Sequence, residues 1–170
     1  LQGRADILGQ AAVIFSEREQ KHARLMTREQ GKPIKESRAE AHGLGSRLEE
    51  EITEIVDALQ PDIVEHGANR STIYHDPPGV VGAITPWNFP MSMPNWMVLP
   101  SLMAGNTVVL KPSEETPLCG QAYADVLNEV LPKDVLIVVH GADDQGKALV
   151  HSDVAMIAFT GSREEGKHNI

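Results

Sequence analysis

Three short polar motifs in this chain each follow an apolar segment that is typical of a buried β-strand. They are TPWN at 85–88, KPSE at 111–114 and TGS at 160–162. In an open parallel sheet, ligands bind beyond the carboxyl ends of the strands. The motifs carry an amide, an ammonium beside a carboxylate, and a hydroxyl. Together they predict one polar binding site at one edge of a sheet.

The second motif places Lys111 three residues before Glu114. An ammonium and a carboxylate can both hydrogen-bond a vicinal diol, so this pair suits a ribose. The carboxylate would also repel an added 2′-phosphate. Taken alone, the same two residues could equally form an exposed surface ion pair.

The third motif places Gly161 and Ser162 at the start of a predicted helix. Free backbone N–H groups and a hydroxyl at such a start can bind a pyrophosphate. Ser162 could also serve as the N-cap of the helix, and both roles can hold at once. The spacing from Gly161 to Gly166 lacks a complete G-x-G-x-x-G fingerprint.

The first motif places Trp87 and Asn88 in a bend between Pro86 and Pro90. Two prolines make the bend rigid, and a rigidly held amide suits a preorganised donor to an oxyanion. Asn88 could instead bond its own backbone in an Asx-type turn. Trp87 could pack against a nucleotide or in the protein core.

The composition excludes several classes of function. Of 170 residues, 41% are hydrophobic and 23% charged, which is typical of a globular domain. The net charge of −9 argues against general nucleic-acid binding, and the seven histidines lack metal-ligand spacing. We find no membrane-spanning run and no signal peptide, and Cys119 is the only cysteine. We therefore expect a cytoplasmic protein without a disulfide, a bound metal or a membrane partner.

Both ends of the chain resemble positions inside a longer sequence. The chain lacks an initiator methionine and opens inside a predicted helix. It stops just after its last predicted helix begins. We therefore expect a fragment of a longer protein.

Periodic patterns divide the chain into an N-terminal helical part, a hairpin and an alternating part. Apolar residues at helical spacing predict two helices, at about 4–30 and 34–59. Two short alternating segments around a bend at 67–69 predict a β-hairpin. Because a two-stranded hairpin is marginal alone, we expect it to join a sheet elsewhere or in a partner subunit.

From residue 79 onward, four apolar strands alternate with helices. The predicted strands are GVVGAIT, NTVVLK, VLIVVHG and VAMIAFT. Near-continuous apolar strands separated by helices indicate a parallel sheet that is covered on both faces. The predicted fold class is therefore α/β, with a Rossmann-like parallel sheet and flanking helices.

The segments PPGVVGAITPWNFP, AGNTVVLKPSEETP and IAFTGSREEG together resemble the NAD(P)-dependent aldehyde dehydrogenase superfamily. The resemblance runs continuously through 79–166, and the upstream elements match the family order more loosely. It implies that 1–60 are N-terminal helices of the cofactor domain and that 61–76 form an oligomerisation hairpin. Residues 77–170 would then be an incomplete Rossmann-like cofactor-binding domain, with the catalytic domain absent from this chain.

The resemblance also implies a role for each motif. Asn88 would stabilise the oxyanion of a thiohemiacetal, and Lys111 and Glu114 would hold the adenosine ribose. Ser162, beside Gly161, would contact the pyrophosphate. The other residues that would line the cofactor are Ile84, Thr85, Pro86, Trp87 and Ser113.

In that family a cysteine thiolate attacks the aldehyde, hydride passes to the nicotinamide, and a glutamate activates the water that releases the acid. Both residues lie beyond Ile170 in such proteins, so we expect this chain alone to be inactive. Cys119 falls inside a predicted helix and is expected to be core filler. Two residues depart from the family pattern. Met97 stands where many relatives have a lysine with a proposed proton-relay or positioning role, and Glu165 stands where relatives usually have an aliphatic residue against the adenine.

The resemblance predicts an aldehyde dehydrogenase that uses NAD, with NADP possible, and that forms a homodimer or homotetramer when complete. Two other interpretations remain open: a truncated, non-catalytic nucleotide-binding or subunit-interaction module, and an acylating enzyme that uses coenzyme A instead of water. The aldehyde itself is not predicted. Four apolar residues could line its path or belong to the core: Phe89, Met93, Trp96 and Met97.

Overall fold

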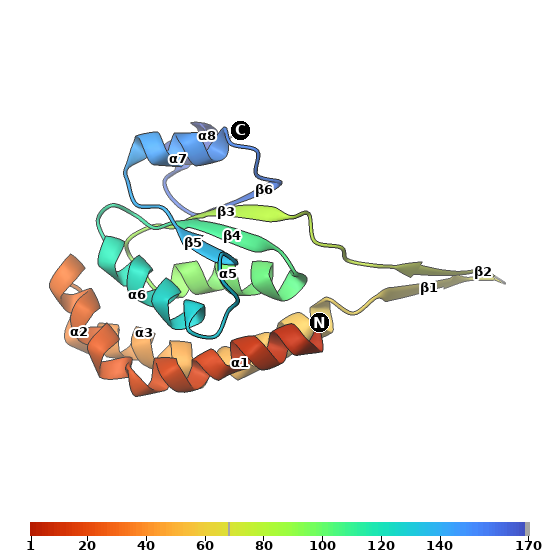
Figure 1. The fold of residues 1–170 in the computed structure, drawn as a ribbon, viewed down its shortest axis with the longest axis horizontal. Coiled ribbons are helices and arrows are strands. Elements are labelled where there is room, and N and C mark those ends of the chain that lie inside the picture. Colours follow the sequence, from red (N-terminus) through yellow and green to blue (C-terminus); the bar gives the residue numbers. More distant parts are fainter. Residues whose placement is uncertain (68, 169–170) are drawn as a thin grey trace.

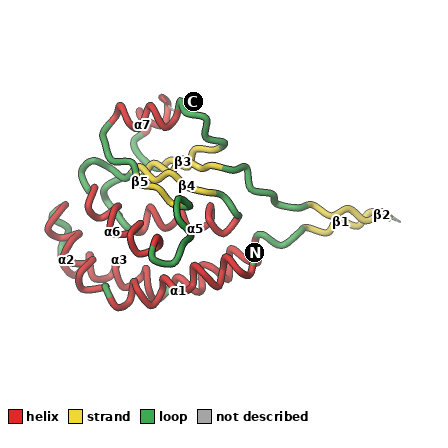
Figure 2. Tube along the Cα trace, viewed as in Figure 1, coloured by secondary structure: helices red, strands yellow, loops and turns green. Residues whose placement is uncertain are grey.

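The structure is a computed structural model that describes residues 1–67 and 69–168, without the side chains of residues 164, 165 and 168. The expectation for Glu165 therefore lies outside the described residues. Figures 1 and 2 show the arrangement of the elements. In chain order they are α1 (Gln2–Glu17), α2 (Glu19–Gln30), α3 (Ile34–Ser46), α4 (Leu48–Ala58), β1 (Asp62–His66), β2 (Asn69–Ile73), β3 (Val80–Ile84), α5 (Ser92–Ala104), β4 (Thr107–Lys111), α6 (Pro117–Asn128), β5 (Leu136–Val138), α7 (Asp143–Val150), β6 (Met156–Phe159) and α8 (Arg163–His168).

The four predicted apolar strands form one parallel sheet in the order β5-β4-β3-β6. The chain passes from β3 through β4 to β5 and then returns to the other side of β3 as β6. The direction of winding therefore reverses between β3 and β6. This sheet confirms the predicted α/β class and creates a switch point of the kind where open sheets bind ligands.

Helices cover both faces of the sheet, as its apolar strands require. Helices α5 and α6 lie on one face, with α1 to α4 outside them, while α7 and α8 lie on the other face (Figure 1). Gly82 in β3 allows α7 to approach closely. A Cβ atom at that position would lie 2.8 Å from Ile157 Cδ1 and 3.1 Å from Leu149 Cγ.

The prediction of two long N-terminal helices was wrong, because each is divided into two. The first breaks at Arg18, with φ −99° and ψ 6°, and the second at Arg47, with φ −109° and ψ −9°. The breaks let four short helices fold against one another and against α5 and α6. Helix α3 approaches α1 closely at Gly45, where a Cβ atom would lie 3.0 Å from the backbone nitrogen of Ser16.

The predicted hairpin is present and extends away from the body of the molecule (Figure 2). Strands β1 and β2 pair antiparallel, from Asp62 opposite Ile73 to His66 opposite Asn69, and every residue of both strands is exposed. Its contact with another sheet or subunit stays a prediction. In the part of the chain that the structure describes, no helix is both long and apolar enough to cross a membrane.

Candidate functional site

The three polar motifs meet at the carboxyl edge of the parallel sheet. Ile84, the last residue of β3, lies opposite Lys111 in β4 and opposite Phe159 in β6. The pairing continues one residue further, because Thr85 N–H donates to the Lys111 carbonyl and Thr160 N–H to the Ile84 carbonyl, each at 3.2 Å. The residues that follow the three strands therefore leave the sheet side by side.

A cleft of about 930 Å³ opens at this edge. It spans the reversal between β3 and β6, where an open sheet is expected to bind its ligand. All ten residues that the sequence singled out line it: Ile84, Thr85, Pro86, Trp87, Asn88, Lys111, Ser113, Glu114, Gly161 and Ser162. The structure thus places them around one space, while their individual roles stay predictions.

Lys111 is held at the base of the cleft rather than on the surface. Its side chain is only 6% exposed, and its Nζ lies 3.5 Å from Glu114 Oε2. The Nζ also donates to the Pro112 carbonyl at 3.2 Å. Lys111 is buried and Glu114 is half exposed, so the two residues do not form the exposed surface ion pair considered as the alternative.

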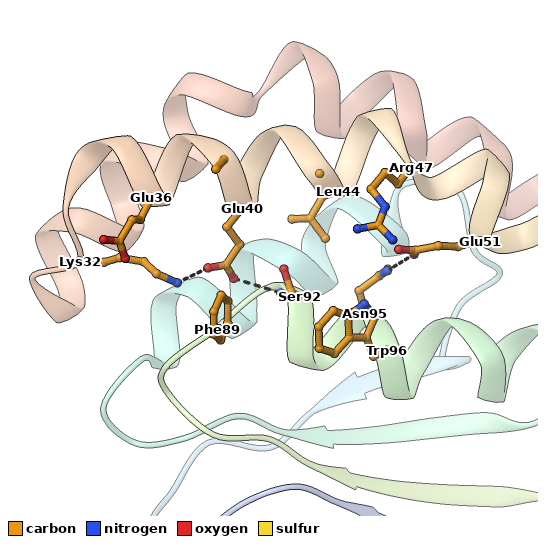
Figure 3. A pocket seen from close by; sticks show the side chains of 12 residues that line it. Lys32, Glu36, Glu40, Leu44, Arg47, Glu51, Phe89, Ser92, Asn95 and Trp96 are labelled. Atoms are coloured by element: carbon orange, nitrogen blue, oxygen red, sulfur yellow. Dashed lines mark hydrogen bonds and ion pairs between the residues drawn. The ribbon is translucent and has the colours of Figure 1, made fainter.

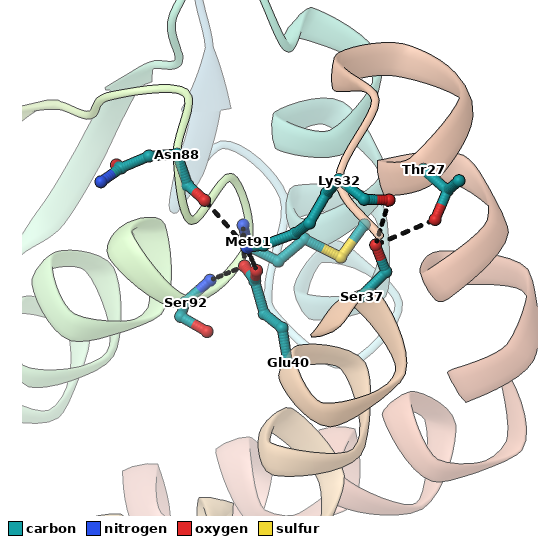
Figure 4. A network of polar contacts seen from close by, with 7 residues as sticks. All are labelled: Thr27, Lys32, Ser37, Glu40, Asn88, Met91 and Ser92. Carbon is teal, nitrogen blue, oxygen red and sulfur yellow. Dashed lines mark hydrogen bonds and ion pairs between the residues drawn. The ribbon is translucent and has the colours of Figure 1, made fainter. Parts of the chain in front are cut away.

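The bend after β3 presents Trp87 and Asn88 to solvent and to the cleft. Trp87 is 52% exposed, so the core-packing alternative for this residue is wrong. The side-chain amide of Asn88 makes no hydrogen bond within the described residues, which does not support an Asx-type turn. Figure 4 shows its carbonyl directed toward Lys32 while its amide points the other way. The amide therefore remains available to a bound molecule.

Gly161 and Ser162 form the turn between β6 and α8, and both are exposed. The first backbone bond of α8 runs from Gly166 N–H to the Ser162 carbonyl at 3.0 Å. Ser162 is thus the residue from which α8 begins. That position is compatible with both predicted roles, a helix cap and a contact to a bound phosphate.

The cleft has a further wall that the sequence analysis missed. It is formed by the turn after β5 and the start of α7: Ala142, Asp143, Gly146 and Lys147. The sequence could have indicated this wall, because VLIVVHG was predicted as a fourth parallel strand. The end of that strand must lie at the same edge of the sheet as the ends of the other three. Gly146 lies over the stem of Lys111, where a Cβ atom would make ordinary contact with Cδ at 3.7 Å.

A second set of missed residues lies behind the bend, on the N-terminal helices. Lys32 and Glu40 form a buried ion pair. Lys32 Nζ donates to the Asn88 carbonyl at 2.8 Å, and Glu40 Oε1 accepts from the backbone N–H groups of Met91 and Ser92 at 3.1 Å each (Figure 4). No local pattern in the sequence links residues so far apart.

A smaller cavity of about 380 Å³ lies on the opposite side of the bend (Figure 3). Phe89 and Trp96, both partly exposed, line it opposite Glu40 and Arg47. The bend therefore sends Asn88 into the larger cleft and Phe89 into the smaller cavity. Of the other two apolar residues considered, Met93 lines the larger cleft, while Met97 packs against the core.

Cys119 is fully buried in α6, which confirms its expected place in the core. Burial raises the pKa of its thiol far above the ordinary value, and the nearby Glu29 carboxylate raises it further. A thiol that stays protonated is a poor nucleophile. Cys119 is therefore not a candidate for covalent catalysis. Among the described residues, no group of three His, Cys, Asp or Glu side chains could hold a metal ion.

Comparisons with known proteins agree with this geometry. Residues 1–169 match the model of the aldehyde dehydrogenase family. The chain is 40% identical over 166 residues to malonate-semialdehyde dehydrogenase from Halalkalibacterium halodurans, an alignment that covers 94% of this chain and 34% of that protein.

Two solved structures are also similar. The structure of PnpE in complex with nicotinamide adenine dinucleotide has a TM-score of 0.89 and 34% identity, over 98% of this chain and 35% of that chain. An Escherichia coli NADP-dependent enzyme has a TM-score of 0.89 and 36% identity, over 98% of this chain and 36% of that chain. The chain spans about a third of the length of the curated relatives it matches.

Proposed function

The chain belongs to the aldehyde dehydrogenase family, and from that premise we propose that it supplies the cofactor site and the oxyanion-binding amide of an NAD-dependent aldehyde dehydrogenase. The reaction would be the oxidation of an aldehyde to a carboxylic acid through a thiohemiacetal and a thioester. The observation that carries the proposal is the single cleft in which a buried lysine, its carboxylate partner and the Asn88 amide lie together.

The residues of the cleft fit a dinucleotide. Lys111 and Glu114 offer a donor and an acceptor to the two hydroxyls of a ribose, and the carboxylate disfavours a 2′-phosphate. Gly161 and Ser162 would contact the pyrophosphate, while Ile84, Thr85, Pro86, Trp87 and Ser113 would line the remaining length. NAD is therefore the expected cofactor, and NADP a weaker alternative. When bound, it would accept the hydride.

Asn88 would act on the aldehyde oxygen. When a thiolate adds to the carbonyl carbon, this oxygen gains negative charge, and a fixed amide donor stabilises it most when the donor needs no reorganisation. The smaller cavity beside Phe89 and Trp96 would admit the aldehyde from the other side of the bend. The attacking cysteine and the base that activates water would come from outside this chain, so 1–170 alone would not oxidise aldehydes.

Further parts of the proposal concern organisation. Residues 1–60 and 77–170 would form one incomplete cofactor domain, and the hairpin at 61–76 would join a second subunit in a homodimer or homotetramer. The hairpin is suited to this because its outer edges pair with no other strand among the residues that the structure describes, and because it exposes Ile63, Val64, Ile73 and Tyr74. The complete protein would work in the cytoplasm, a reducing compartment that suits a chain whose only cysteine is Cys119.

Calorimetric titration of the 170-residue chain with NAD and NADP tests the cofactor proposal. We expect NAD to bind more tightly, and Lys111→Met to weaken NAD binding by roughly tenfold, because a buried charge-assisted donor is lost. Lys133→Met is the matched control, since Lys133 is 91% exposed and lies outside the cleft. Absence of NAD binding, or equal losses in the two variants, would contradict the assignment.

Steady-state assays of the complete dehydrogenase test the catalytic proposal. The aldehyde panel should include malonate semialdehyde, the substrate in the name of one relative. Asn88→Ala is expected to lower kcat by roughly 10²-fold or more, with the affinity for NAD unchanged. A kcat within twofold of wild type would remove Asn88 from the mechanism.

A further inference from the structure

The bend at 86–92 is held from behind by a buried ion pair. Lys32 follows the end of α2 and Glu40 lies on α3, so both come from the N-terminal helices. Their side chains are only 8% and 2% exposed. Water cannot solvate the two charges at this buried position, so each charge is stabilised by the other. Removing one partner would leave a buried, unpaired charge, which is strongly destabilising.

Each member of the pair also binds the backbone of the bend. Lys32 Nζ donates to the Asn88 carbonyl at 2.8 Å and lies 4.0 Å from the centre of the Phe89 ring. One Glu40 oxygen accepts from Lys32, and the other accepts from the N–H groups of Met91 and Ser92 at 3.1 Å. The pair therefore fixes the peptide groups on both sides of Pro90.

The position of Lys32 is itself determined by its surroundings. Gly31 adopts a left-handed conformation, with φ 77°, and ends α2 just before the lysine. Ser37 Oγ donates to the Lys32 carbonyl at 3.5 Å and accepts from Thr27 Oγ1 at 3.0 Å (Figure 4). Lys32, which binds the bend, is therefore itself held in place by hydrogen bonds from its neighbours.

We propose that Lys32 and Glu40 are positioning residues for Asn88, which keep its amide aimed into the cleft. Residue 88 is tied at its carbonyl, and its amide extends from the same backbone in the opposite direction. A donor to a developing oxyanion loses most of its effect when it is misplaced by about 1 Å. This inference rests on the proposed role of Asn88, and it adds that Lys32 and Glu40, on the N-terminal side of the chain, affect catalysis through that amide rather than by acting on the reacting groups.

A double-mutant cycle in the complete dehydrogenase tests the inference. Lys32→Met removes the donor and the charge, and we expect it to lower kcat by roughly tenfold while the Kd for NAD changes by less than about twofold. In the Asn88→Ala background, the same substitution should lower kcat by less than about twofold, because the group it positions is gone. Lys35→Met is the matched control, since this lysine is exposed on α3 and should leave kcat unchanged.

A second cycle covers the case in which Lys32→Met does not fold. Glu40→Gln keeps an oxygen that can accept from Met91 and Ser92 but loses the charge. We expect a smaller loss of kcat, which again disappears in the Asn88→Ala background. Hydrogen exchange of the Met91 and Ser92 amides should become faster in Glu40→Gln, because a neutral acceptor binds them less strongly.

The outcomes separate this inference from the function on which it rests. If Asn88→Ala keeps the wild-type kcat, the proposed function of the amide is refuted. If Asn88→Ala loses activity but Lys32→Met and Glu40→Gln do not, only the positioning role is refuted. Equal losses of kcat in the wild-type and Asn88→Ala backgrounds would also overturn it, since they would show that the pair acts independently of the amide.

Discussion

His22 makes the stability of the chain depend on pH. The residue lies on α2 with 2% of its surface exposed, and its ring meets the edge of Phe15 at 6.0 Å between centroids. Its Nδ1 has no hydrogen-bond partner among the described residues. Its pKa is lowered from 6.5 to about 4, chiefly by burial and also by the positive charges of Lys21 and Arg18. Protonation is therefore much easier in the unfolded chain than in the folded one.

The direction and size of the effect follow from this difference. Well above pH 6.5 the imidazole is neutral in both the folded and the unfolded state, and His22 does not oppose folding through protonation. As the pH falls from 6.5 toward 4, only the unfolded state gains the proton, so the free energy of unfolding decreases. Between pH 7.5 and pH 5.0 the His22 contribution amounts to a loss of about 2 kcal/mol.

Urea unfolding of the 170-residue chain at the two pH values measures this loss. Other groups titrate in the same range, so the prediction concerns the difference between variants. His22→Phe should lose about 2 kcal/mol less than wild type on acidification, because phenylalanine cannot take a proton. His66→Gln, at an exposed position on the hairpin, should behave as wild type. If His22→Phe and wild type lose equal stability between pH 7.5 and 5.0, the burial of His22 does not control the acid response.

Three further predictions concern the cap of α6, the contact of α1 with α3, and the choice of cofactor. The Glu29 carboxylate accepts hydrogen bonds from two backbone N–H groups at the start of α6, at 2.7 and 2.8 Å. Glu29→Ala should therefore lower the free energy of unfolding, measured in urea, by about 1–2 kcal/mol. An unchanged free energy of unfolding would contradict this. Gly45→Ala would press a methyl group against the backbone of Ser16 and should cost about 1–3 kcal/mol in the same assay, an expectation that an unchanged midpoint would refute. Glu114→Gln removes a negative charge from the cleft and should narrow the preference for NAD over NADP by roughly fivefold in calorimetry, whereas an unchanged ratio of affinities would remove Glu114 from that choice.

Local sequence patterns were sufficient to predict the parallel sheet and the edge of the sheet at which the three polar motifs lie. The four apolar strands were predicted because the burial pattern of a strand depends on residues close in sequence. The parallel order of the strands then required TPWN, KPSE and TGS to share one edge. This is why the ten predicted residues line one cleft, although their roles await the experiments above.

The breaks in the N-terminal helices could not be read from the same patterns. Residues 16–22 carry no apolar side chain, but neither glycine nor proline lies near Arg18 to stop a helix. In the folded chain the Arg18 guanidinium binds Glu129 beyond the end of α6, with Nη2 at 2.9 Å from Oε2. Both α1 and α2 contact α6 in the folded chain, so tertiary packing overrides the local preference for one continuous helix.

By itself, then, the sequence determined the class of fold, the strands of the parallel sheet and the residue types at the sheet edge, because each depends on neighbours along the chain. Only the tertiary structure decided which distant groups meet. Glu29 caps a helix 89 residues away, and Lys32 binds a carbonyl 56 residues away. Such contacts follow from the packing of helices against one sheet, which no local periodicity encodes.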